Sequence, residues 1–243
     1  MGEAALAFPV EDSAETYRLL LARAAALKVP CFWPALPGRP GLTALERAGL
    51  LRLASAIPGA CSEAKMVALM EAMRHAPAGD VVEIGSREGR SAALLACLAG
   101  RYQIGSVLCV DSWRSESPTS EADDALRIFE INLAPLAQGR LNYLRAPSSQ
   151  AGSLYGPGLE VESDAFGRTR YQGRIALLHV DGDPREWKSW ISKVEVGGWI
   201  VICCEGSTGP AARRAGDSLL AGDEERIGAR FEAGGALFLQ LRR

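Results

Sequence analysis

The sequence of 243 residues is short of several features that mark common classes of protein. Neither sign of charge is in excess, because 27 basic and 29 acidic residues leave a formal net charge of −2, which gives no electrostatic basis for binding nucleic acid. No apolar segment approaches the ~20 residues of a membrane-spanning helix, and no segment has the pattern of a signal peptide. We therefore expect a soluble protein whose partners include neither a membrane nor a nucleic acid.

Cys-x-x-Cys pairs are also absent among the six cysteines. Several of the cysteines fall inside apolar segments, where a free cysteine acts as a small hydrophobic residue. Free thiols of this kind are typical of a reducing compartment, so we expect a cytoplasmic protein. The six are Cys31, Cys61, Cys97, Cys109, Cys203 and Cys204.

Hydrophobic residues make up 48% of the chain, which is enough for a substantial core. The first 76 residues predict an N-terminal helical extension, with helices over about 12–28, 43–56 and 62–75. Residues 77–243 predict a separate α/β domain, because strands alternate there with helices as in a parallel sheet with crossover helices. The predicted strands are 80–84, 107–111, 141–145, 175–180 and 199–204, the helices are 89–99, 121–136, 184–194 and 209–221, and 226–241 predicts a β-hairpin.

Residues 81–91, Val-Val-Glu-Ile-Gly-Ser-Arg-Glu-Gly-Arg-Ser, are the most informative segment. They predict a buried strand, a tight turn at Gly85 and a helix beginning near Gly89, so that backbone N–H groups can approach a ligand closely. The segment is not the dinucleotide fingerprint, which needs Gly-x-Gly-x-x-Gly. Glu83 would repel a pyrophosphate but suits a cation or a set of hydroxyls. A nucleoside with a charged amino-acid tail therefore fits better than a dinucleotide.

This segment resembles the first motif of the class I S-adenosylmethionine (SAM) methyltransferases. The segment that ends in Asp111 is similar to that family's second strand, and 177–183 and 197–202 are similar to its fourth and fifth. The nearest likeness within the class is to small-molecule O-methyltransferases that tailor macrolide sugars and cephalosporins. The resemblance implies an α/β fold, with a Rossmann-like, seven-stranded, mostly parallel sheet that ends in a C-terminal antiparallel hairpin. It covers residues 78–205 well, 206–243 by pattern only, and 1–60 not at all.

The resemblance also implies that SAM is the cofactor. Gly85 and Gly89 would shape the turn against SAM, and Glu83 would lie near its methionine end or hold the turn in place. Asp111 would accept hydrogen bonds from the ribose hydroxyls. Trp113 would either stack on the adenine or pack beneath the helix at 121–136. The other predicted cofactor contacts are Ser86, Ser91, Ser112 and Ser148.

The candidate catalytic residues are Asp181, Asp183 and His179. By strand periodicity His179 shares a face with Asp181, and the alternative for it is a buried structural histidine. In relatives, a histidine that can act as the base follows this Asp-Gly-Asp, and Pro184 replaces it here. The catalytic part of the family pattern is thus less well kept than the SAM-binding part.

Metal-dependent relatives hold Mg²⁺ with the fourth-strand acid and an acid pair after the fifth strand. Here Cys203 and Cys204 replace that pair, and magnesium prefers oxygen ligands, so we expect no metal. Two alternatives stay open. One is zinc bound by the two cysteines with Asp181 and His179, and the other is a weak Mg²⁺ site through Asp181 and Glu205.

Residues 146–173 show no clear periodicity and contain five glycines. A loop of this length is commonly functional, and we expect a lid whose aromatic residues Tyr155, Phe166 and Tyr171 close over an acceptor. The alternative is a surface insertion packed on the N-terminal helices.

The sequence as a whole predicts SAM-dependent methyl transfer to a small-molecule acceptor, at a hydroxyl oxygen. One alternative is a SAM-binding regulatory or scaffold protein without activity, and a second is a nicotinamide-dependent oxidoreductase. A homo-oligomer is compatible with the sequence.

Overall fold

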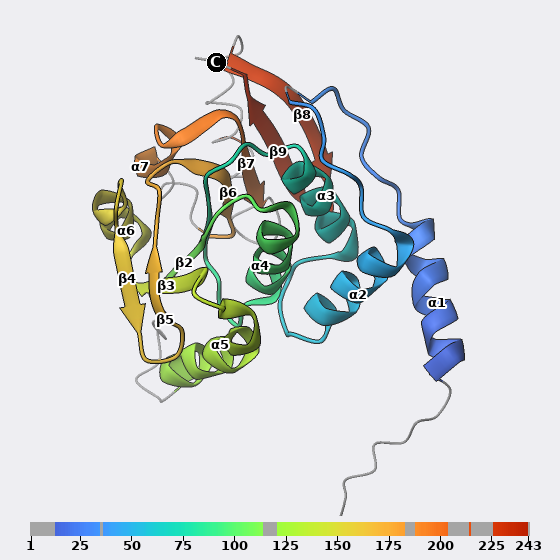
Figure 1. The fold of residues 1–243 in the computed structure, drawn as a ribbon, viewed down its shortest axis with the longest axis horizontal. Coiled ribbons are helices and arrows are strands. Elements are labelled where there is room, and N and C mark those ends of the chain that lie inside the picture. The colour runs from blue at the N-terminus through green and yellow to red at the C-terminus, as the bar shows by residue number, and fades with distance from the viewer. Residues whose placement is uncertain are drawn as a thin grey trace, which may run out of the picture.

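A single seven-stranded sheet forms the centre of the computed structural model, which describes residues 13–34, 36–113, 121–182, 188–203, 214 and 226–242 (Figure 1). The strand order is β3-β2-β1-β6-β7-β9-β8. β9 pairs antiparallel with β7 and with β8, whereas the pairs among β3, β2, β1, β6 and β7 are parallel. The predicted Rossmann-like sheet with its C-terminal antiparallel hairpin is confirmed.

Outside residues 146–173 the observed elements follow the predicted ones, except that β7 begins at Val194, where the sequence predicted the end of a helix and a strand only from 199. The strands are β1 Asp80–Ile84, β2 Val107–Asp111, β3 Leu141–Arg145, β4 Glu160–Ser163, β5 Gly167–Arg170, β6 Ile175–Val180, β7 Val194–Cys203, β8 Ile227–Ala233 and β9 Ala236–Leu241. The helices are α1 Ser13–Ala26, α2 Ala44–Ser55, α3 Glu63–Arg74, α4 Arg90–Tyr102, α5 Glu121–Ala137, α6 Ser148–Leu154 and α7 Lys188–Ile191. The helix predicted over 209–221 lies outside the described residues.

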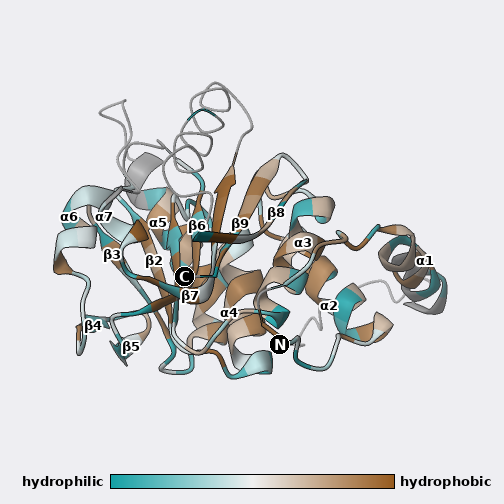
Figure 2. Cartoon of the chain, turned by 90° about the horizontal axis from the view of Figure 1, so that it is seen from above, coloured by the Kyte–Doolittle hydropathy of each residue, from teal (hydrophilic) through white to brown (hydrophobic). Residues whose placement is uncertain are grey.

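Helices cover both faces of the sheet, and each face has its own hydrophobic core. Alternate residues of β1 point to opposite faces, so that Val81 joins a core with α3, α4 and α5, while Val82 joins a second core with α6 and α7. In Figure 2 the hydrophobic residues gather on the strands and on the helices α3 and α4. The result is a three-layer α/β/α arrangement.

The N-terminal helices differ in how they relate to the sheet. α1 contacts α2 and lies at the margin of the molecule, away from the strands (Figure 1). α2 begins at the predicted capping box, in which Thr43 and Glu46 each bond the other's backbone N–H. α3 belongs to the main core, where its methionine face is buried against the sheet. The predicted domain boundary at residue 76 therefore lies just after α3, and α3 packs in the same hydrophobic core as the strands.

Residues 146–173 contain the helix α6 and the β4–β5 hairpin, and the prediction of a lid here is wrong. The Tyr155 hydroxyl donates to Asp80 Oδ2 at 2.8 Å, and the Tyr171 hydroxyl donates to the carbonyl oxygen of Val107 at 2.9 Å. Asp80 and Val107 begin β1 and β2, so both tyrosines are anchored at the amino ends of the strands. Phe166 packs 5.9 Å from Phe129 of α5, measured between ring centroids. The three aromatic residues of the segment therefore pack against the rest of the domain and do not close over a ligand.

Among the described residues, no helix combines the length and apolar character that crossing a bilayer requires.

The anchoring of α6 by Asp80 gives a first prediction. Asp80 Oδ2 accepts hydrogen bonds from Tyr155 and from the backbone N–H groups of Gln172 and Gly173. Tyr155→Phe should lower the free energy of unfolding by ~1 kcal/mol, the usual net value of one hydrogen bond, as measured by urea denaturation. Tyr102→Phe is the control, because Tyr102 is also a largely buried tyrosine and its hydroxyl makes no hydrogen bond to the described part of the chain. Equal effects of the two substitutions would contradict the anchor.

Candidate functional site

An open cavity of about 390 Å³ lies at the carboxyl ends of four parallel strands, β3, β2, β1 and β6. From β1 the chain crosses to β2 on one side, while β6 lies on the other, and ligands of open α/β sheets bind at such a switch point. The volume is within the range for small-molecule sites. The cavity is lined by Ile84, Gly85, Arg87, Val110, Asp111, Ser112, Ala146, Pro147, Ser148, Asp181 and Gly182.

Gly85 allows β1 and β6 to approach each other at the floor of the cavity. Its φ is +84°, and a Cβ atom there would lie 2.0 Å from the carbonyl oxygen of Asp181. Any other residue would displace the strand end that carries Asp181. The nearby backbone of Asp181 therefore requires glycine at position 85, whether or not a ligand is bound.

Gly89 makes room for α5, whereas the sequence predicted that it shapes the turn against SAM. Its φ is +93°, and a Cβ atom would lie 2.3 Å from Leu133 Cδ2 and 3.1 Å from Phe129 Cδ2. Both residues belong to α5. Gly89 therefore lets α5 pack against the turn, and it does not line the cavity.

Asp111 ends β2 at the edge of the cavity with both of its carboxylate oxygens fixed. Oδ1 accepts a hydrogen bond from the backbone N–H of Trp113 at 2.8 Å, and Oδ2 accepts one from the N–H of Arg87 at 3.0 Å. Each oxygen keeps a second lone pair that a ligand hydroxyl can use. The geometry is suited to a ribose, and it also ties the β1–α4 turn to β2.

Trp113 packs in the core, and its predicted stacking on adenine is wrong. Only 4% of the residue is exposed, and it does not line the cavity. Its Nε1–H donates to the carbonyl oxygen of Arg87 at 2.9 Å, and its ring lies 5.0 Å from that of Phe129 and 5.4 Å from that of Tyr143. The alternative, packing beneath α5, is correct.

The predicted serines are divided between the cavity and the core. Ser112 and Ser148 line the cavity, although Ser148 Oγ accepts a hydrogen bond from Trp190 Nε1 at 3.0 Å. Ser86 and Ser91 are buried, and neither lines the cavity. Both serines are thus enclosed by the protein and do not face the cavity.

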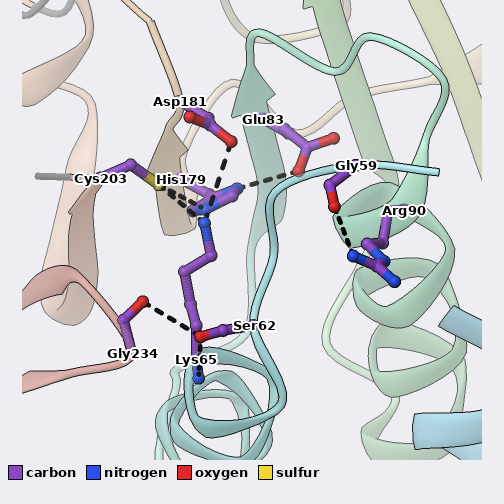
Figure 3. A network of polar contacts seen from close by, with 9 residues as sticks. All are labelled: Gly59, Ser62, Lys65, Glu83, Arg90, His179, Asp181, Cys203 and Gly234. Carbon is purple, nitrogen blue, oxygen red and sulfur yellow. Dashed lines mark hydrogen bonds and ion pairs between the residues drawn. The ribbon is translucent and has the colours of Figure 1, made fainter. Parts of the chain in front are cut away.

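A row of buried polar side chains runs beside the cavity across β1, β6 and β7 (Figure 3). His179 Nδ1 lies 2.9 Å from Glu83 Oε1, and His179 Nε2 lies 3.4 Å from Cys203 Sγ. Both ring nitrogens are thus engaged inside the protein, and neither Glu83 nor His179 reaches the cavity. The structure therefore favours the alternative of a buried structural histidine, and Glu83 holds that histidine.

Lys65 joins this row from α3, and sequence reasoning missed it. Its Nζ donates to Cys203 Sγ at 3.1 Å and lies 3.9 Å from Asp181 Oδ2. Only 2% of the Lys65 side chain is exposed, against 25% of the Asp181 side chain. The one signal in the sequence was a lysine within an otherwise apolar helical segment, Ala-Lys-Met-Val-Ala-Leu-Met.

Electrostatics support charged forms in this row. Burial alone would lower the pKa of His179, but the Cys203 sulfur and the Glu83 carboxylate raise it to about 10. Burial would also lower the pKa of Lys65, but Cys203, Cys61 and Asp181 hold it above its ordinary value. A buried cation is tolerated only beside compensating groups. Here the carboxylate of Glu83 lies against His179, and the carboxylate of Asp181 and the sulfur of Cys203 lie against Lys65.

Asp181 is thus the candidate catalytic residue that faces the cavity. Asp183, Pro184, Cys204 and Glu205 lie outside the described residues. Within the described part, no three His, Cys, Asp or Glu side chains are grouped so that they could hold a metal ion.

Residues 82–202 match the model of a family described as a methyltransferase domain. The chain thus contains a methyltransferase domain. The match begins within β1 and ends within β7, and so contains Gly85, Asp111 and Asp181. SAM is accordingly the cofactor.

Solved structures resemble this protein at low sequence identity. The calicheamicin methyltransferase CalS11 is 13% identical with a TM-score of 0.50, over 96% of this chain and 94% of that one. A proposed O-methyltransferase from Klebsiella pneumoniae is 16% identical with a TM-score of 0.50, over 84% and 92%. The O-methyltransferase NovP is 15% identical with a TM-score of 0.48, over 83% and 82%. No curated protein matches the sequence.

The position of Asp111 predicts a role in holding the cofactor. Asp111→Ala should weaken SAM binding by ~1–3 kcal/mol, because the ribose hydroxyls lose a charged acceptor. Asp111→Asn should cost less, since one acceptor oxygen remains. Isothermal calorimetry measures both, with Asp164→Ala, an exposed change on the β4–β5 hairpin, as control. Unchanged affinity in Asp111→Ala would refute the assignment to the ribose.

The raised pKa of His179 predicts that stability falls at alkaline pH. The folded value is about 10 against 6.5 for a free histidine, so the stabilisation is complete below pH 6.5 and is lost as the pH rises through 10. Chemical denaturation should show the unfolding free energy falling across this window by at most ~1.4 kcal/mol per pH unit. His179→Gln should flatten the profile. An identical slope in that variant would show that a group other than His179 causes the pH dependence.

Proposed function

We propose that the protein transfers a methyl group from SAM to a hydroxyl oxygen of a small-molecule acceptor. The observation that carries the proposal is a cavity at the switch point that has two carboxylates. Asp111 lies at the end of β2, and Asp181 directly follows β6, on the other side of β1. The solved structures with a TM-score of 0.50 are described as a calicheamicin methyltransferase and a proposed O-methyltransferase, which is compatible with a hydroxylated acceptor.

The residues of the cavity fit SAM. The turn at Gly85 presents backbone without a side chain, and Asp111 offers free lone pairs to vicinal hydroxyls. The walls at Ala146, Pro147 and Ser148 carry no charge and suit a base. When bound, SAM supplies a methyl group on a positively charged sulfur, and that charge is lost as the methyl group leaves.

Asp181 is the residue that we assign to the acceptor. Its carboxylate faces the cavity and can accept the proton of an acceptor hydroxyl as that oxygen is methylated. The same contact would orient the oxygen toward the donor, which is a further part of the rate enhancement. His179 contributes indirectly, because it lies behind Asp181 and makes its hydrogen bonds within the protein.

We also place the protein in the cytoplasm. The cysteines Cys61, Cys109 and Cys203 are free and buried, as expected of a chain that folds in a reducing compartment.

The proposed reaction predicts label transfer from methyl-labelled SAM to a hydroxylated compound. Wild-type protein should bind SAM more tightly than NAD⁺ in calorimetry. It should then label one member of a panel of deoxysugars, nucleotide sugars and phenols. Asp181→Asn should lower kcat at least tenfold, because the group that accepts the proton is lost. SAM binding without labelling of any compound would favour a binding protein, and tighter binding of NAD⁺ would favour an oxidoreductase.

A fifth prediction concerns metals. Turnover should persist after dialysis against a chelator, because the ammonium of Lys65 lies between Asp181 and Cys203 and repels a cation there. Complete loss of turnover with recovery on Mg²⁺ would instead indicate a site at Asp181 and Glu205. Recovery on Zn²⁺ alone would indicate the cysteines.

A further inference from the structure

Asp181 and Lys65 form an ion pair of which only one member faces the cavity. The ammonium of Lys65 lies 3.9 Å from Asp181 Oδ2 and is buried, whereas the Asp181 carboxylate lines the cavity and is partly exposed. A ligand in the cavity therefore meets the carboxylate directly, with a fixed positive charge immediately behind it. The ligand therefore experiences the Lys65 charge together with that of Asp181, in addition to the charges of Arg87 and Asp111 on the cavity wall.

We propose that Lys65 is the built-in counter-ion of Asp181, and that it sets how strongly the cavity favours a cationic ligand over a neutral one. The inference rests on the assignment of SAM to this cavity. It makes Lys65 a positioning residue that acts through Asp181, and a determinant of the preference between the cationic donor SAM and its neutral product S-adenosylhomocysteine (SAH).

The reaction explains why such a counter-ion is useful. The positive charge of the donor is present in the ground state and diminishes in the transition state. A carboxylate without compensation would stabilise the ground state more than the transition state, and would thereby raise the barrier. The Lys65 ammonium offsets part of that attraction while leaving the carboxylate in place to accept a proton.

The structure holds Lys65 in this position from two sides. At the start of α3 the Lys65 backbone N–H donates to Ser62 Oγ at 3.3 Å, and Ser62 Oγ in turn donates to the Gly234 carbonyl oxygen at 3.2 Å. Gly234, in the β8–β9 turn, has a φ of +53°, and a Cβ atom there would lie 2.2 Å from Lys65 N. At the other end, Nζ donates to Cys203 Sγ, behind which the His179–Glu83 pair closes the row (Figure 3).

The experiment is a double-mutant cycle with two ligands of different charge. SAM and SAH are titrated at pH 7.5 into wild type, Lys65→Met, Asp181→Asn and the double variant, and the ratio of the two affinities is compared. Lys65→Met should shift the ratio toward SAM by about tenfold, which corresponds to ~1.4 kcal/mol. Asp181→Asn should shift it toward SAH by a similar factor. The double variant should return near the wild-type ratio, and Lys65→Arg, which keeps the charge, should stay there.

Several results would overturn the inference. One is that Lys65→Met changes the affinities for SAM and SAH by the same factor, which is what a purely structural role predicts. Another is an unchanged ratio in Asp181→Asn. If Lys65→Met does not fold, Asp181→Asn and Lys65→Arg still decide the question, because the first must shift the ratio and the second must not. Failure of the wild type to bind either ligand would refute the cofactor assignment itself.

Discussion

The close approach of β1 and β6 at their carboxyl ends is the constraint on which the site depends. The Asp181 N–H donates to the Ile84 carbonyl oxygen at 2.8 Å, and Gly85 follows with no room for a side chain against Asp181. This pairing brings Asp181 to the floor of the cavity and sets His179 opposite Glu83 in the strand register. One backbone contact therefore positions both the residue that faces the ligand and the buried pair behind it.

The second feature of the protein is a set of charges inside a hydrophobic core. Lys65, Glu83 and His179 are buried among aliphatic residues, where each alone would carry a large desolvation cost. They are tolerated because each lies against a partner, with Lys65 against Cys203 and Asp181 and with His179 against Glu83. Since the partners come from α3, β1, β6 and β7, these contacts also fix the position of α3 on the sheet (Figure 3).

The predictions from sequence were accurate for structure that the local pattern of residues sets. The glycine turn at Gly85 and the strand ending in Asp111 are local features, because strand periodicity and turn chemistry are encoded in neighbouring residues. The predictions for Trp113 and for residues 146–173 were wrong for a common reason. Their aromatic side chains were assigned to a ligand, but they found partners on α5 and at the amino ends of β1 and β2 that no local pattern reveals. Lys65 was missed for the same reason, since its sulfur partner is 138 residues away.

The sequence by itself thus determined the class of fold, the order of its strands and helices, the cofactor, and two of the carboxylates at the carboxyl ends of the strands. The fold and the carboxylates follow from periodicity, from the glycine turn and from strand ends, all of which are properties of short segments, and the cofactor follows from the resemblance of those segments to methyltransferase motifs. The tertiary structure alone decided which polar residues face the cavity and which are buried, because that depends on packing between segments far apart in the chain. Asp181 remained at the surface of the cavity while His179, two residues earlier on the same strand, was enclosed by Glu83, Cys203 and the helix that carries Lys65.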